Sequence, residues 1–149
     1  MIYNTVIKGG INTIDGSLTT LERIHHAAKA EFLKKGYKDA SLRNIVKSVG
    51  MTTGAFYGYY KSKEELFESL VDKHYQYILT RFKTAQREFA QLPHEQQPEV
   101  MSDISGICMF DILHYAYAHL EECKLILCCS EGTRFSGLID EMVEIETEA

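Results

Sequence analysis

The sequence predicts an all-α protein, and two observations carry that prediction. Apolar residues recur three and four positions apart along most of the chain, which is the spacing of one face of a helix. The alternation with period two that is typical of strands occurs nowhere beyond the first residues. With 149 residues, 45% of them hydrophobic and 25% charged, the chain has the size and composition of an ordinary globular domain. These values argue against a disordered, collagenous or disulfide-dense protein.

The N-terminal part predicts an arm and three helices. Residues 1–17 are expected to form a loose arm, with a hairpin around Gly9 and Gly10 as the alternative. A first helix is expected from Leu18 until Gly36, where two lysines and a glycine end the apolar series. Two shorter helices are expected to follow it, over residues 42–49 and 53–60. Ser41 and Thr52 are their N-caps, and Gly50 supplies the turn between them.

The remaining chain predicts a helical bundle. Ser62 and Glu65 have the spacing of a capping box and open a long helix that is expected to reach about Phe89. Two prolines mark a connection over residues 91–98. Three more helices are expected over residues 101–115, 121–130 and 135–143. The first of the three is apolar over most of its girth, which is typical of a helix in the middle of a bundle.

Charge is distributed unevenly along the chain. The whole chain has a formal net charge of −5. Residues 17–63, however, carry nine Lys and Arg against three Asp and Glu, whereas residues 64–149 carry six against 17. This segregation favours a cationic module that faces a polyanion and is carried by an acidic body. Two solvated surfaces of opposite sign are the alternative.

No stretch is long and apolar enough to span a bilayer, and the first 20 residues lack the features of a signal peptide, so a cytoplasmic protein is expected. In a reducing cytosol the four cysteines are expected to be free thiols that pack as small hydrophobic groups. They lie without zinc-site spacing in the C-terminal third, as Cys108, Cys123, Cys128 and Cys129.

Residues 42–60 have the spacing of a helix-turn-helix, whose second helix enters the major groove of DNA. The residues after the glycine turn make the pattern specific. They read Thr52-Thr53-Gly54-Ala55-Phe56-Tyr57-Gly58-Tyr59-Tyr60-Lys61-Ser62-Lys63-Glu64. With the preceding helix, this stretch resembles the tetracycline-repressor (TetR) family of bacterial transcriptional regulators over about Thr20 to Leu70.

The resemblance implies a set of DNA contacts. Hydroxyls at the start of the third helix suit phosphates or base edges, and small residues there let the backbone approach the duplex. Phe56 and Tyr60 are expected in the core. Gly58 departs from the family pattern, which usually has a larger side chain, so specificity is expected to rest on Arg43, Thr53 and Tyr57. The positions that contact DNA in family members are Ser41, Arg43, Thr52, Thr53, Gly54, Ala55, Tyr57, Tyr59 and Lys63.

The resemblance also implies that the later helices bind a small ligand and form a homodimer, with the long helix transmitting ligand binding to two DNA-binding heads. Core packing is the alternative for each candidate pocket residue. The candidates are Tyr75, Tyr77, Phe82, Met109, Phe110, Tyr115, Tyr117 and Met142. Family members are longer and pair through two final helices. The bundle is therefore expected to lack those helices, and the chain either is truncated or pairs through residues 135–143.

The leading prediction is a TetR-type transcriptional regulator, a repressor that binds palindromic operator DNA as a homodimer and is released by a small molecule. Its predicted parts are the arm (1–17), the helix-turn-helix head (18–63) and the regulatory bundle (64–149). A helical ligand-binding or protein-interaction bundle with a vestigial helix-turn-helix is one alternative. A thiol-based sensor is the other, because His114 and His119 lie near the cysteines. No enzyme, cofactor or metal site is predicted, because the chain has no glycine-rich phosphate loop and no HExxH motif.

Overall fold

The computed structural model describes residues 18–148, and in that range every regular element is a helix, which confirms the all-α prediction. The predicted arm and its alternative hairpin lie outside the described residues. The elements are α2 (Thr20–Asp39), α3 (Leu42–Val49), α4 (Thr53–Phe56), α5 (Lys63–Ala90), α6 (Gln97–Ala118), α7 (Leu120–Cys128), the 3-10 helix η2 (Arg134–Gly137) and α8 (Leu138–Glu148).

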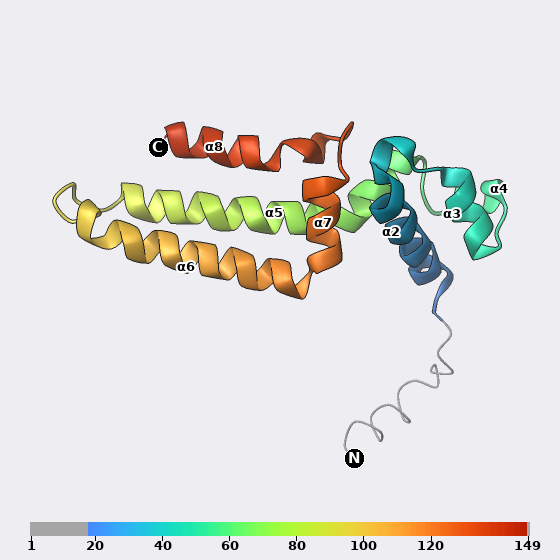
Figure 1. The fold of residues 1–149 in the computed structure, drawn as a ribbon, viewed down its shortest axis with the longest axis horizontal. Coiled ribbons are helices and arrows are strands. Elements are labelled where there is room, and N and C mark those ends of the chain that lie inside the picture. Colours follow the sequence, from blue (N-terminus) through green and yellow to red (C-terminus); the bar gives the residue numbers. More distant parts are fainter. Residues whose placement is uncertain (1–17, 149) are drawn as a thin grey trace, which may run out of the picture.

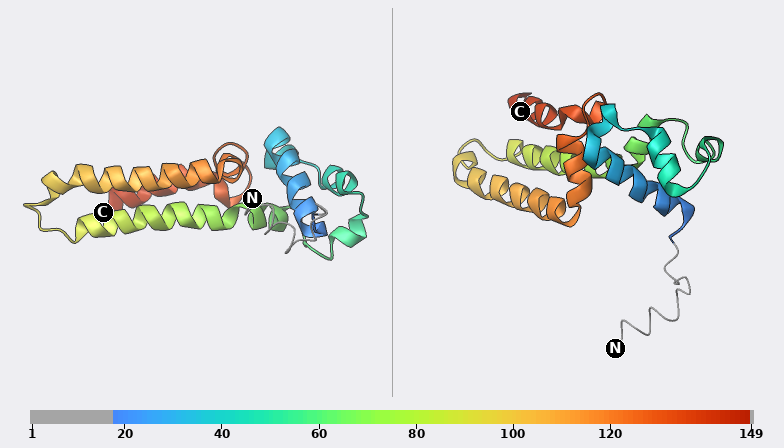
Figure 2. Two further views of the ribbon diagram at one scale, coloured as in Figure 1. Left: turned by 90° about the horizontal axis from the view of Figure 1, so that it is seen from below. Right: turned by 45° about the vertical axis from the view of Figure 1, so that its right-hand side comes forward.

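The helices are arranged as a head and an elongated body (Figure 1). We call α2, α3 and α4 the head and α5 to α8 with η2 the body. Helix α5 starts beneath the head and runs along the body, where α6 returns antiparallel to it. Helix α8 packs along α5 as well, and α7 crosses between α2 and α5; Figure 2 shows the same arrangement from two further directions.

Local signals set most helix ends. Thr19 and Glu22 form a capping box at the start of α2, and Ser41 caps α3. The Ser62 hydroxyl accepts from the Glu65 amide and starts α5, but the Glu65 carboxylate accepts from the Lys61 amide, so only half of the predicted capping box forms. Gly50 closes α3 with φ 74°, a left-handed conformation that disfavours other residues.

Three of the expected elements differ from the structure. The last helix, expected over residues 135–143, is the 3-10 helix η2 followed by α8, which reaches Glu148. The third helix was expected over residues 53–60, but α4 ends at Phe56 and residues 57–59 form a turn. Gly58 explains this end, because glycine is a poor helix former. The helix over residues 101–115 was expected inside the bundle. Helix α6 instead packs on α5 along one side, and most of its apolar side chains are exposed.

One apolar core joins the head to the body. Phe32 on α2, Val46 on α3 and Phe56 on α4 are buried together with Phe67 on α5. The same connected core continues along α5 into the body, where Phe135 of η2 is also buried. The start of α5 therefore belongs to the core of the head, and the head has a fixed position on the body. No helix in residues 18–148 is both long and apolar enough to cross a membrane.

Candidate nucleic-acid interface

The head presents the outer faces of α3 and α4 to solvent. Apolar residues fix both helices from inside, with Ile45 and Val49 of α3 and Phe56 of α4 buried. A hydrogen bond from the Arg23 guanidinium to the Val49 carbonyl, 2.5 Å long, ties the end of α3 to α2. The side chains that remain outside are therefore held on a fixed frame.

The structure brings most of the predicted DNA-contacting residues onto this outer face. Tyr57 is 54% exposed and Tyr59 is 46% exposed, and both lie in the turn that follows α4. Phe56 is fully buried and Tyr60 is partly buried against it, as predicted. The exposed members of the predicted set are Arg43, Thr52, Thr53, Gly54, Ala55, Tyr57 and Tyr59.

Two of the predicted hydroxyls serve as helix caps. The Ser41 hydroxyl accepts from the Asn44 amide at 3.3 Å, and the Thr52 hydroxyl accepts from the Ala55 amide at 3.1 Å. A capping oxygen still has its own O–H to donate. Both residues thus fix the start of a helix and keep one donor, whereas Thr53 is exposed without a capping role.

Lys63 has a structural role that the sequence analysis missed. Its ammonium donates to the carbonyls of Tyr37 at 2.7 Å, Lys38 at 3.2 Å and Ala40 at 3.1 Å, and lies over the Tyr37 ring. An ammonium has three N–H donors, so these three acceptors saturate it. Lys63 therefore joins the start of α5 to the end of α2, and the charge predicted to meet a phosphate is already engaged.

Other cations on this side of the head are free. In residues 18–148, Arg43 and Lys47 on α3 and Lys61 before α5 form no ion pair. Lys29 and Lys38, by contrast, pair with acidic residues of the body. Lys47 and Lys61 were counted in the basic segment but not chosen as contacts. The sequence could not separate them from paired lysines, because the pairing partners lie far away along the chain.

The candidate ligand residues do not surround one cavity. Phe82 and Met109 line a hollow of about 260 Å³ between α5, α6 and the end of α8, and Met142 lines an adjoining one with Phe82. Tyr75 is buried against Phe135, and its hydroxyl donates to Glu141 at 2.7 Å. Burial, helped by that carboxylate, raises the pKa of Tyr75 to about 12. Helical spacing alone did not distinguish residues that line the hollow, such as Phe82, from residues packed in the core, such as Tyr75.

The other four candidates lie outside the hollow. Phe110 and Tyr117 are exposed on α6, with 83% of Tyr117 accessible. Tyr77 and Tyr115 stack on each other, with ring centroids 3.7 Å apart.

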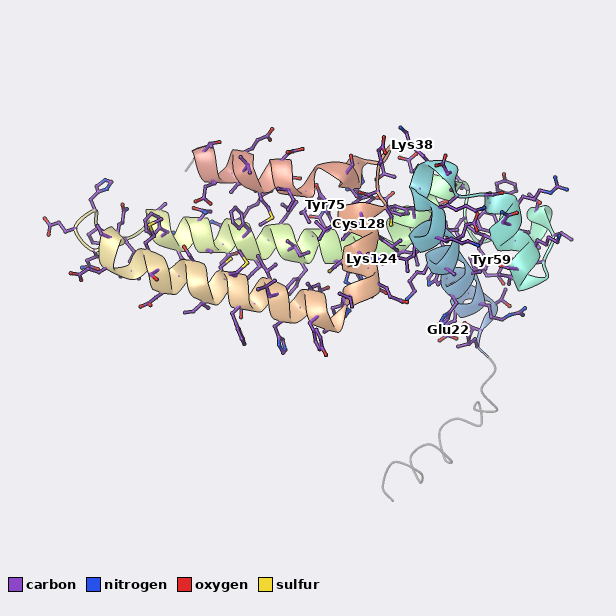
Figure 3. The ribbon with its side chains drawn as sticks, viewed as in Figure 1. Glu22, Lys38, Tyr59, Tyr75, Lys124 and Cys128 are labelled. Atoms are coloured by element: carbon purple, nitrogen blue, oxygen red, sulfur yellow. The ribbon has the colours of Figure 1, made fainter. Side chains whose placement is uncertain are left out.

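The cysteines are free thiols, and three of the four are buried, in agreement with the expected packing. Burial raises the pKa of Cys108, Cys123 and Cys129, which keeps these thiols protonated and poorly reactive. Cys128 is exposed on α7 (Figure 3). The arrangement gives a thiol-based sensor little support.

Comparisons with known proteins agree with this interface. Residues 24–70 match the family model described as bacterial regulatory proteins, tetR family. The match begins in α2, contains α3, α4 and the turn that follows, and ends in the first part of α5. It therefore contains the whole exposed face described above.

Two relatives extend the comparison. Over 50 residues the chain is 42% identical to an uncharacterised HTH-type transcriptional regulator, YdgC, of Bacillus subtilis (strain 168). That alignment spans 34% of this chain and about a quarter (26%) of the relative. The fold resembles the crystal structure of a transcriptional regulator (TerR/AcrR family) from Aquifex aeolicus VF5. That match has a TM-score of 0.53 and 26% identity, and covers 85% of this chain and 68% of the other.

Proposed function

Because the chain belongs to the tetR family of bacterial regulatory proteins, we propose that it is a transcriptional regulator whose head binds double-stranded DNA. The observation that carries this proposal is the exposed face of α3 and α4, where unpaired cations lie beside exposed tyrosines and threonines. Cations and hydroxyls contact phosphates, and side chains that reach base edges read the sequence.

Within this face the residues have different roles. Arg43 and Lys47 contact phosphates or bases from α3, and Lys61 extends the cationic surface beyond α4. Thr53 and Tyr57 lie where the second helix of a helix-turn-helix meets the groove. Gly54 and Ala55 allow the backbone to come close to the duplex. Ser41, Thr52 and Tyr59 complete the contact set, while Lys63 supports the frame behind it.

The regulator acts as a homodimer on a palindromic operator. Two copies of the head read two half-sites about one helical turn of DNA apart, or a multiple of it. Exposed apolar side chains on α6 and α8 support pairing, because a surface of this kind is typical of an interface. They include Phe110, Leu113 and Tyr117 on α6 and Ile139 and Val143 on α8.

A small molecule releases the operator, and the chain acts as a repressor. The hollow between α5, α6 and α8 is the candidate place for an apolar effector, with Phe82 and Met109 at its wall. The head is fixed to the body by ion pairs and by a backbone hydrogen bond from Tyr37 to Cys129. A shift of the body on binding an effector would therefore reach the head.

The first step of the test is to sequence the DNA fragments that the protein retains from its own genome. One retained fragment is then titrated with the protein at several salt concentrations. The logarithm of the binding constant should fall linearly with the logarithm of salt, with a slope of about −0.9 per phosphate contact. Arg43→Ala and Lys47→Ala should each flatten that slope by about one unit. Lys124→Ala is the matched control, because Lys124 is an exposed cation on α7, away from Tyr59 and the interface (Figure 3).

Two results would contradict the proposal. One is the absence of sequence-selective binding at low salt, which would favour a bundle with a vestigial helix-turn-helix. The other is a salt slope that changes as much in Lys124→Ala as in the two α3 variants, because the contact surface would then lie elsewhere.

A further inference from the structure

Three potential metal ligands converge where α5, α6 and α7 meet. His74 comes from α5, His119 from the junction of α6 and α7, and Glu122 from the first turn of α7. One ligand atom from each lies within 4.8 Å of the others. His74 is 2% exposed, and the other two side chains are partly buried. The cluster is thus inside the molecule, unlike the acidic groups that gather on most protein surfaces.

The neighbouring side chains hold the two imidazoles in place. The Nδ1 atom of His74 lies 2.9 Å from the Tyr115 hydroxyl, which leaves Nε2 for another partner. The His119 ring lies against both, with centroids 4.7 Å from His74 and 4.4 Å from Tyr115. Tyr77 stacks on Tyr115, with ring centroids 3.7 Å apart. Hydrogen bonds to the second ring nitrogen are the usual way in which proteins orient a histidine toward a metal ion.

We propose that His74, His119 and Glu122 form a binding site for a divalent transition-metal ion of the Zn²⁺ class. Two imidazoles and one carboxylate are ligands that Zn²⁺ and Co²⁺ accept, with a water molecule or an exogenous ligand in the fourth position. A tetrahedral ion with bonds of about 2.1 Å brings its ligand atoms to about 3.4 Å from one another. The present separations are at most 4.8 Å, so each pair of ligand atoms needs to close by no more than about 1.4 Å.

The site shares one ligand with a contact between body and head. The Lys29 ammonium on α2 donates to Glu122 at 3.0 Å and to Glu121 at 2.9 Å. A metal ion competes with Lys29 for Glu122, whereas Glu121 stays with Lys29. Metal binding thus replaces one of the ion pairs between α7 and α2. The regulatory consequence, a change in DNA affinity, rests on the proposed function; the metal site itself does not.

The site is tested with Co²⁺ on the full chain, because tetrahedral Co²⁺ gives intense visible absorption bands. Cys128→Ser serves as the background, since Cys128 is the exposed thiol of the described cysteines and would compete for the ion. His119→Gln and Glu122→Gln should weaken Co²⁺ binding at least tenfold, and Zn²⁺ should displace Co²⁺ from the parent protein. Thermal unfolding of each variant shows that it is folded.

Matched controls separate ligation from general charge effects. Glu121→Gln removes the same charge from the same Lys29 but no ligand, and His114→Gln removes an exposed histidine of α6. Both should change the Co²⁺ affinity less than threefold. Lys29→Met removes the competitor and should tighten binding severalfold, so the proposal can also be tested without deleting a ligand. No Co²⁺ bands in the parent protein, or equal losses in Glu121→Gln and Glu122→Gln, would overturn the site.

DNA binding is measured separately, first with EDTA and then with Zn²⁺. If the metal-free chain retains DNA and Zn²⁺ changes its affinity in the parent and Glu121→Gln but not in Glu122→Gln, the regulatory link is supported. Co²⁺ bands without any DNA binding would refute the proposed function and leave the metal site standing. Zn²⁺ binding with unchanged DNA affinity would overturn the link alone.

Discussion

His25 is a partly buried titratable residue on α2. Its Nε2 atom lies 2.5 Å from the Tyr60 hydroxyl, and its ring is partly buried between α2 and the turn after α4. Burial lowers the pKa of His25 from its ordinary value, the nearby Lys29 and Lys73 lower it further, and Glu22 opposes them. The folded protein therefore binds a proton here less readily than the unfolded chain.

Acid should destabilise the protein through His25. Because the folded-state pKa is the lower one, the unfolded state gains protons first as pH falls below about 6.5, and the free energy of unfolding decreases there. The decrease ends once pH falls below the folded-state pKa. His25→Gln should make this dependence shallower in urea unfolding between pH 7 and pH 5, and the part that remains is expected from His74, whose pKa burial also lowers. His26→Gln, an exposed neighbour, should retain the slope, and equal slopes in all three proteins would contradict the assignment.

Lys63 should stabilise the protein because its ammonium donates hydrogen bonds to three carbonyls. Lys63→Met keeps an unbranched side chain of similar length but removes all three hydrogen bonds, which should lower the free energy of unfolding by about 1–2 kcal/mol. Lys61→Met, at an exposed lysine without a described ion pair, should change it by less than about 0.5 kcal/mol. Chemical denaturation measures both, and similar losses in the two variants would show that the three hydrogen bonds contribute little.

At the level of helices, two glycines of the helix-turn-helix, Gly50 and Gly54, should respond oppositely to substitution by alanine. Gly50 has φ 74°, so Gly50→Ala should cost about 1 kcal/mol. Gly54 lies in α4 with no atom within 4 Å of an added Cβ, so Gly54→Ala should stabilise by about 0.5–1 kcal/mol.

The same Gly54→Ala variant should bind DNA more weakly, because the added methyl group separates the backbone from the duplex. Thermal unfolding and DNA titration on one preparation check both effects. A variant that gains stability and keeps full DNA affinity would remove Gly54 from the contact set.

The starts of helices that have a local capping signal were predicted well. The capping residues Ser41, Thr52 and Ser62 lie at the starts of α3, α4 and α5 in the structure. Elements that depend on distant contacts were predicted less well. The environment of α6 is set by which helices cover it, and its apolar composition does not report this.

For the molecule as a whole, the exposed apolar side chains of α8 and α6 predict a dimer. The paired substitution Ile139→Glu with Val143→Glu should raise the dimer dissociation constant at least tenfold, since it buries two charges at the interface. Sedimentation velocity measures the effect. Leu127→Glu is the control, because Leu127 lies on α7 and is 56% exposed, like both α8 residues.

Phe135 is not part of that prediction, although the apolar series over residues 135–143 suggested pairing. It is 2% exposed and belongs to the core. A chain that is monomeric at all concentrations, or a Leu127→Glu variant that dissociates as readily, would argue against pairing through α8.

The sequence predicted most of the exposed face of α3 and α4 because one contiguous stretch, from Arg43 to Tyr59, carries it. It did not predict the His74, His119 and Glu122 cluster, because His74 on α5 lies far along the chain from His119 and Glu122 at the start of α7. It also did not distinguish free from paired lysines in the head. The cluster forms when α5, α6 and α7 pack together within the body, whereas Lys29 and Lys38 find their partners when the body packs against the head.

Helix α5 runs without interruption from the core of the head to the far end of the body. Its 28 residues span about 42 Å at 1.5 Å per residue, so a tilt of only about 5° at one end displaces the other by about 4 Å. Such a rod amplifies small rearrangements and transmits them without bending. A proline placed halfway along it would act as a hinge. The head and the body could then each still bind a ligand, but binding by one would no longer affect binding by the other.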